Sequence, residues 1–147
     1  MKYACAMLLL ALAPTAAYSA STPQTTPLPA LLAKPVDKAE ARFKARVTED
    51  LGKNKFRVED GGKRIEIKGG PHWFHTLPLE TGRTYTFDGE LHVKDKDGER
   101  KIELRLVRVW RADGARFDVR ANAKAEPWKG IDKDKAGAPA VLVWHKS

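Results

Sequence analysis

Residues 83–95 read RTYTFDGELHVKD, an alternating stretch with a glycine at its centre. An aromatic pair before Gly89 and an aliphatic pair after it alternate with polar residues. Strict alternation is typical of a strand that buries one face. A glycine inside such a long strand commonly marks a bulge or a sharp bend at a barrel corner. The stretch is therefore predicted to be a long strand with a bend at its centre.

The same period of two recurs on both sides of this strand. Turn signals separate the alternating segments, among them DGG at 60–62 and KDKDGER at 94–100. The further strands are predicted at 41–48, 55–60, 63–69 and 101–111, with a short sixth candidate at 115–121. Within the last long strand the phase slips after Leu106, which indicates either a bulge or an end that is covered on both faces.

The order of these strands predicts an all-β barrel. Three strands, an insert without alternation at 69–82, and two long strands follow one another. This is the order of the five-stranded Greek-key barrel called the OB-fold. In that fold a short helix or turn between strands three and four closes one end of the barrel. An open antiparallel sandwich is the main alternative.

Two segments also carry a family resemblance. FRVEDGGKRIEIK at 56–68 and TYTFDGELHVKDKDGERKIELRLVRV at 84–109 resemble the bacterial OB-fold (BOF) family of small exported proteins. The resemblance covers about residues 41–110 and lies in strand pattern and turn residues, with no catalytic signature. It implies a periplasmic, non-enzymatic binding module, often linked to envelope stress. The histidines of the insert and the C-terminal continuation depart from the family pattern.

The two ends of the chain are predicted to lie outside a barrel domain at 36–121. Residues 1–20 have the charged start, apolar run and small residues of a secretory signal peptide, and the run is too short to span a bilayer. Residues 21–35 contain four prolines and are predicted to be a mobile tether. Residues 122–147 form an extension whose apolar APAVLVW segment predicts a final strand. We expect a periplasmic or secreted protein without a membrane span.

The composition argues against an enzyme. Cys5 is the only cysteine and lies in the predicted signal peptide, so the mature chain would have no disulfide, iron–sulfur cluster or cysteine nucleophile. The sequence shows no Ser-His-Asp spacing, no phosphate loop and no His-Glu-x-x-His motif. We therefore expect a protein without catalytic residues and without a cofactor.

The insert contains two histidines on either side of an aromatic pair. On a helix, His72 and His75 would share one face, but a zinc site needs three or four ligands. They are therefore weak metal candidates. We favour a structural role, in which Trp73, Phe74 or Leu77 fills the open end of the barrel and at least one histidine stays exposed.

The formal net charge of +8 favours anionic partners. The alternation places basic side chains on the outer face of the first three strands and turns most aromatic side chains inward. This pattern favours electrostatic binding of a nucleic acid or an acidic glycan over base stacking along a strand. The predicted binding residues are Arg42, Lys44, Arg46, Lys55, Arg57, Arg64, Lys68 and Trp110.

A second hypothesis comes from a different functional class. The protein would be a structural or protein-interaction module of the envelope with a role in envelope stress. Its C-terminal strand would then make the contact with a partner. An apolar strand outside the barrel offers an edge that can pair with a partner.

Overall fold

The computed structural model describes residues 24–146, so the predicted signal peptide lies outside the described part of the chain. The elements are α1 (Leu28–Ala33), β1 (Glu40–Gly52), β2 (Lys55–Asp60), β3 (Lys63–Lys68), β4 (His75–Thr76), β5 (Thr84–Lys96), β6 (Glu99–Trp110), β7 (Arg116–Asp118), the 3₁₀ helix η1 (Lys133–Lys135) and β8 (Ala140–Val141). Between residues 24 and 146 no helix is both long and apolar enough to cross a bilayer.

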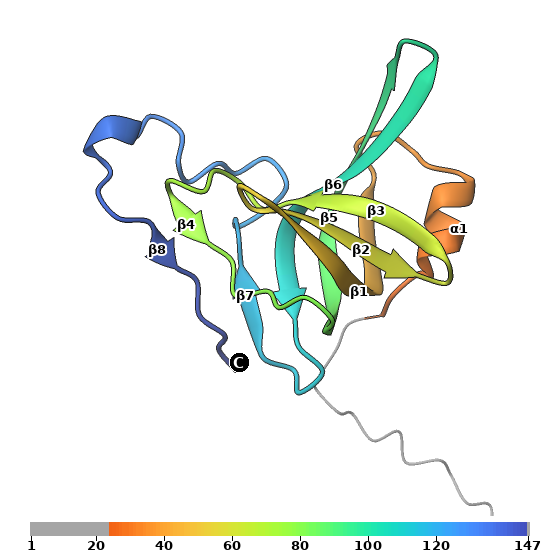
Figure 1. The fold of residues 1–147 in the computed structure, drawn as a ribbon, viewed down its shortest axis with the longest axis horizontal. Helices are drawn as coiled ribbons and strands as arrows, with labels where there is room; N and C mark the ends of the chain where they lie inside the picture. The colour runs from red at the N-terminus through yellow and green to blue at the C-terminus, as the bar shows by residue number, and fades with distance from the viewer. Residues whose placement is uncertain (1–23, 147) are drawn as a thin grey trace, which may run out of the picture.

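The main sheet closes into a barrel (Figure 1). Its strand order is β3-β2-β1-β5-β6-β7, and β3 also pairs in parallel with β6 between residues 66–68 and 103–105. The strands β1, β2, β3, β5 and β6 therefore form the closed mixed barrel of an OB-fold. This confirms the predicted fold class, whereas the open sandwich is excluded by the closing pair.

Gly89 marks the bend in β5. The ladder between β5 and β6 shifts register between Asp88 and Gly89, which leaves Val107 as the extra residue of a bulge. A Cβ atom at position 89 would collide with the carbonyl oxygen of Arg105. Beyond the bulge, Val109 turns back into the core and is fully buried. The bulge therefore explains the phase slip seen in the sequence.

One end of the barrel is covered by α1. The Leu28 side chain is 0% exposed and belongs to the hydrophobic core, and the helix packs on β1, β2 and β3. Its first turn is held at the β2–β3 turn, where the Leu28 backbone N–H donates to Asp60 Oδ2 (3.1 Å). The barrel end at this turn is thus closed by a segment from outside the barrel.

The tether predicted at 21–35 is therefore wrong for the described residues of that range. The prolines suggested an unstructured segment, but Pro29 lies in the first turn of α1, where a helix needs no N–H donor. The helix also carries Leu31 and Leu32, which pack partly buried against the core. Burial of these leucines stabilises a helix too short to persist alone.

The insert covers the opposite end of the β2–β3 hairpin. It starts with a turn in which the N–H groups of Phe74 and His75 donate to the Pro71 carbonyl (3.1 and 3.4 Å). Of the three predicted plug residues, Leu77 is buried in the core beside Gly69, while Phe74 and Trp73 are only half-buried. The predicted turn between strands three and four is confirmed, with Leu77 as its core residue.

The C-terminal extension packs back onto the barrel. Its β8 pairs in parallel with β4 of the insert, not with an edge of the barrel. Farther along, the Trp144 ring stacks on Tyr85 (centroids 5.5 Å apart, interplanar angle 11°), and His145 exchanges backbone hydrogen bonds with Arg116. The predicted final strand exists, but it is short and pairs within the chain.

Replacing Leu28 by alanine is expected to lower the free energy of unfolding by about 3 kcal/mol, because the substitution leaves a cavity at the end of the barrel. The control is Val36→Ala, since Val36 is 62% exposed, and the expected change there is within about 0.5 kcal/mol. Urea unfolding measures both. If Leu28→Ala changed the free energy of unfolding as little as Val36→Ala does, α1 would not close the barrel.

Candidate anion-binding surface

The outer face of β1 carries the predicted basic residues. Arg42, Lys44 and Arg46 point outward because the residues between them fill the interior. Arg42 is engaged, with its Nε atom 3.5 Å from Asp88 Oδ1 and its guanidinium 5.2 Å from the Trp110 ring centroid. Lys44 and Arg46 are exposed, and no ion pair joins either of them to another residue within 24–146. They are the free cations of this strand.

Most basic residues on β2 and β3 are neutralised across the sheet. The ion pairs are Arg57 with Glu49 (2.5 Å) and Glu66 (3.8 Å), Arg64 with Glu59 (3.2 Å), and Lys68 with Glu103 (2.7 Å). Lys55 is exposed and has no such partner among the described residues. Opposite charges on neighbouring strands stabilise a sheet, and they also remove these cations from an open basic face.

Trp110 offers little aromatic surface to a ligand because it is buried, and its predicted part in binding stays a prediction. The guanidinium groups of Arg42 and Arg108 lie over its ring, 5.2 and 5.9 Å from the ring centroid. Only 8% of the residue is exposed. The two flanking cations cover the ring, so little of it is left for stacking on a ligand.

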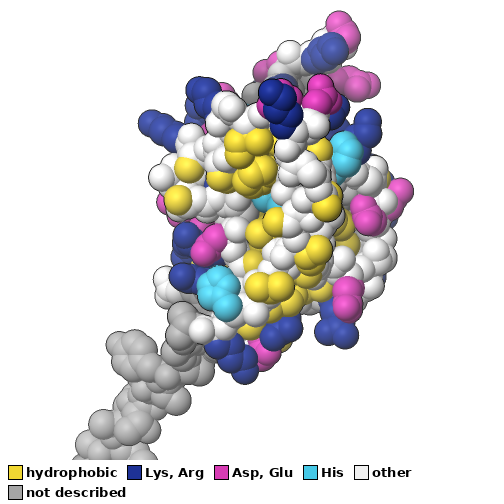
Figure 2. Space-filling view, turned by 90° about the vertical axis from the view of Figure 1, so that its left-hand side faces the viewer, with side chains coloured by type: hydrophobic (Ala, Val, Ile, Leu, Met, Phe, Trp, Pro, Cys, Tyr) yellow, Lys and Arg dark blue, Asp and Glu magenta, His cyan; other side chains and the backbone are white. Residues whose placement is uncertain are grey.

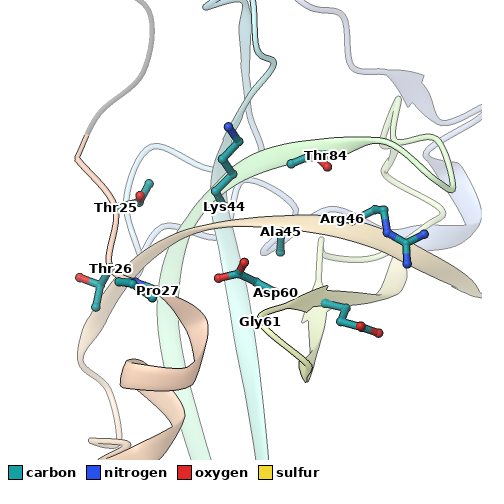
Figure 3. Close-up of a pocket in the computed structure, with 10 residues that line it drawn as sticks. Thr25, Thr26, Pro27, Lys44, Ala45, Arg46, Asp60, Gly61 and Thr84 are labelled. Atoms are coloured by element: carbon teal, nitrogen blue, oxygen red, sulfur yellow. The ribbon is translucent and has the colours of Figure 1, made fainter.

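A cleft of about 560 Å³ lies beside the two free cations of β1 (Figure 3). We call it the β1 cleft, and its lining residues are Thr25, Thr26, Pro27, Lys44, Ala45, Arg46, Glu59, Asp60, Gly61 and Thr84. Both carboxylates in it are engaged, because Glu59 pairs with Arg64 and Asp60 accepts the Leu28 N–H. The cleft therefore presents two unpaired cations and two carboxylates that already have partners.

The segment before α1 forms one wall of the β1 cleft. The Thr26 backbone N–H donates to the Arg42 carbonyl (2.8 Å), which holds the segment against β1. Figure 3 shows Thr25 and Thr26 on the side of the cleft nearer Lys44. The sequence reasoning missed this wall, because it treated the proline-rich segment as a tether.

The two histidines of the insert lie in different environments. His72 is exposed, as expected for at least one of the pair, whereas His75 is only 2% exposed. Nε2 of His75 lies 2.5 Å from the Gly69 carbonyl oxygen, and its ring packs edge-on against Trp128 (5.7 Å). Within residues 24–146 there is no group of three or more residues able to hold a metal ion. That the pair is not a metal centre stays a prediction.

Burial sets the protonation state of His75. Desolvation lowers the pKa of the imidazole, the hydrogen bond to the Gly69 carbonyl opposes this change, and the positive charge of Arg120 adds to the lowering. The folded protein thus favours a neutral His75 ring at neutral pH. The side chain is a buried structural group of the insert, which the alternation of the sequence did not indicate.

Comparisons with known proteins give one structural likeness. No family model and no curated protein matches the sequence. Among solved structures, the chain is similar to the hypothetical protein ygiW from E. coli, with 16% sequence identity, a TM-score of 0.46, and coverage of 59% of this chain and 88% of that chain. The fold assignment rests on the strand pairings themselves.

Lowering the pH from about 7 to about 5 is expected to destabilise the parent more than a His75→Gln variant. The pKa of His75 is lower in the folded state than in the unfolded chain, so the unfolded chain takes up the proton first as the pH falls. The stability that the neutral ring contributes is fully present above about pH 6.5, the pKa of His75 in the unfolded chain. It is lost as the pH falls toward the lower pKa of His75 in the folded protein.

Thermal melting across this pH range measures the effect. The exposed His72 supplies the matched control, and the His72→Gln variant should follow the parent. Identical pH profiles for the parent and His75→Gln would contradict a buried neutral ring.

Proposed function

We propose that this chain is an exported, non-enzymatic OB-fold binding module that binds an anionic polymer, a nucleic acid or an acidic glycan, at the β1 cleft. The observation that carries the proposal is the pair Lys44 and Arg46, exposed cations beside carboxylates that are already engaged. Membership of the BOF family and export from the cytoplasm belong to the same proposal, and they are supported by the strand pattern and the N-terminal sequence.

The pairing of the other cations supports this choice of site. An incoming phosphate or carboxylate must compete with Glu49 and Glu66 for Arg57, whereas no existing pair has to be broken at Lys44 or Arg46. Exposed ion pairs are worth little individually, so binding through two free cations should be weak unless the polymer repeats its charge. The binding should also weaken with salt, because a polyanion releases counter-ions when it is neutralised.

The recognised feature is then the charged backbone of the polymer. The large aromatic side chains of the barrel strands, among them Phe43, Phe56 and Phe87, are buried in the core. Single-strand-binding barrels use exposed aromatic residues as stacking platforms. The threonines of the β1 cleft, Thr25, Thr26 and Thr84, supply hydroxyl groups that can donate to phosphate, sulfate or carboxylate oxygens.

Reversing both charges in a Lys44→Glu, Arg46→Glu variant is expected to weaken binding to heparin and to a single-stranded oligonucleotide at least about tenfold, since two attractions become two repulsions. The matched control is Lys133→Glu, Lys135→Glu, which changes the net charge equally on the exposed η1. Fluorescence anisotropy at low salt measures the affinities, and circular dichroism checks the fold. Equal losses in both variants would show that only the net charge matters.

The C-terminal strand favours a second candidate, a protein-interaction module of the envelope. Val141 and Val143 are 68% and 69% exposed, and Figure 2 shows hydrophobic side chains gathered on the side of the molecule that carries β8. Leu142 and Trp144 pack against the core, so deleting the strand would also damage the barrel. A Val141→Ser, Val143→Ser variant isolates the outer face, and loss of partner binding with unchanged oligonucleotide binding would favour this candidate.

A further inference from the structure

Arg120 is a buried cation without a carboxylate partner. It is 5% exposed, its Nε donates to the Leu106 carbonyl (3.1 Å), and its Nη1 donates to the Ala125 carbonyl (3.4 Å). The guanidinium carbon lies 4.6 Å from the centroid of the Trp128 ring. No carboxylate of residues 24–146 forms an ion pair with it. Burial lowers its pKa to about 10 and repulsion from Arg105 acts in the same direction, while attraction to Glu126 and Glu90, neither of them in an ion pair with Arg120, opposes the change.

A negative partner would stabilise the buried guanidinium of Arg120. Burying a charge away from water is costly unless it is paired and hydrogen-bonded, and the ring of Trp128 offsets only part of that cost. A guanidinium also has more N–H donors than the two carbonyls use. An oxyanion that reaches Arg120 would pair its charge directly and accept hydrogen bonds from the remaining N–H donors.

A pocket of about 200 Å³ adjoins Arg120, between the barrel and the C-terminal extension. The charged residues that line it are Lys68, Lys94, Glu103, Arg105, Arg120 and Glu126. The carboxylates are engaged in the pairs Glu103 with Lys68 (2.7 Å) and Lys101 (3.0 Å), and Glu126 with Arg105 (3.9 Å). Among the described residues, Lys94 has no ion-pair partner. Arg120 and Lys94 are therefore the cations left to receive an anion.

We propose that this space, the Arg120 pocket, binds one oxyanion, a phosphate or carboxylate group, with Arg120 as the donating fork and Lys94 as a second charge. The pocket of about 200 Å³ has room for a group of a few heavy atoms. The Trp128 ring keeps the guanidinium plane in place. Glycine at position 70 is needed here, since a Cβ atom would lie 2.9 Å from the ring of Trp128.

The Arg120 pocket is separate from the β1 cleft. It lies against the outer side of β3, β5 and β6, and in the closed barrel β3 and β6 are not neighbours of β1. The inference therefore goes beyond the proposed function and does not rest on it. A small charged group could bind in the Arg120 pocket whether or not a polymer binds at the β1 cleft.

Titration of the full chain with inorganic phosphate, and separately with acetate, tests the inference at constant ionic strength against chloride. Calorimetry or nuclear magnetic resonance of the Trp128 indole measures binding. We expect saturable binding of at least one anion in the parent and a loss of at least about tenfold in Arg120→Gln, because a charge-assisted fork is removed. A response to phosphate alone or to acetate alone identifies which oxyanion the pocket takes.

Two further variants keep the test decisive. Lys94→Gln removes the second charge of the pocket, and Lys94 is exposed on β5, so this variant should fold. It should weaken anion binding several-fold, and it tests the proposal if Arg120→Gln does not fold. The Lys44→Glu, Arg46→Glu variant should bind the small anion as the parent does, which separates this inference from the proposed function. Absence of saturable binding in the folded parent, or equal binding in the parent and Lys94→Gln, would overturn the proposal.

Discussion

A short parallel pairing between β3 and β6 closes the barrel. It joins only residues 66–68 to residues 103–105, yet it turns an open sheet into a barrel. The bulge at Gly89 bends the β5–β6 pair as the barrel requires. A closed barrel has two open ends, and segments from outside its five strands cover them, α1 at one end and the insert with the C-terminal extension at the other.

The same pairing also distributes the charges. It brings Lys68 onto Glu103, and the register of the neighbouring strands brings Arg57 onto Glu66. A net charge of +8 therefore does not produce a continuous basic face. The cations that matter for the proposed sites are Lys44 and Arg46 on β1 and Arg120 beside the extension, none of which forms an ion pair with a residue of 24–146. Each lies beside a cleft or pocket.

The strand pattern of the barrel could be predicted from the sequence because alternation and turn residues are local signals. The bend at Gly89 is also a local signal, and it proved to be a bulge. The role of α1 could not be predicted in this way. Its leucines stabilise the helix only when they pack against the open end of the barrel, and that contact is not a local signal. The proline-rich composition pointed to a tether instead.

The candidate sites were less predictable for a related reason. Alternation says which side chains face outward, but cross-strand register decides which of them meet, and a period of two does not set the register by itself. The sequence therefore predicted Arg57 as a free cation, whereas the register of β1 and β2 places Glu49 opposite it and the two form an ion pair. His75 and Arg120 both pack against Trp128, which is far from His75 in the sequence and lies in a segment without a periodic pattern.

We propose that an anionic polymer binds at Lys44 and Arg46 of β1 and not over the whole outer face of the barrel. Backbone amide shifts in nuclear magnetic resonance spectra, followed during titration with a short heparin oligosaccharide or oligonucleotide at low salt, distinguish the two. Binding at the β1 cleft would place the largest shifts on residues 25–26, 44–46, 60–61 and 84, which line the cleft and carry backbone amides. Shifts concentrated on Arg57, Arg64 and Lys68, or no saturable shifts at all, would contradict it.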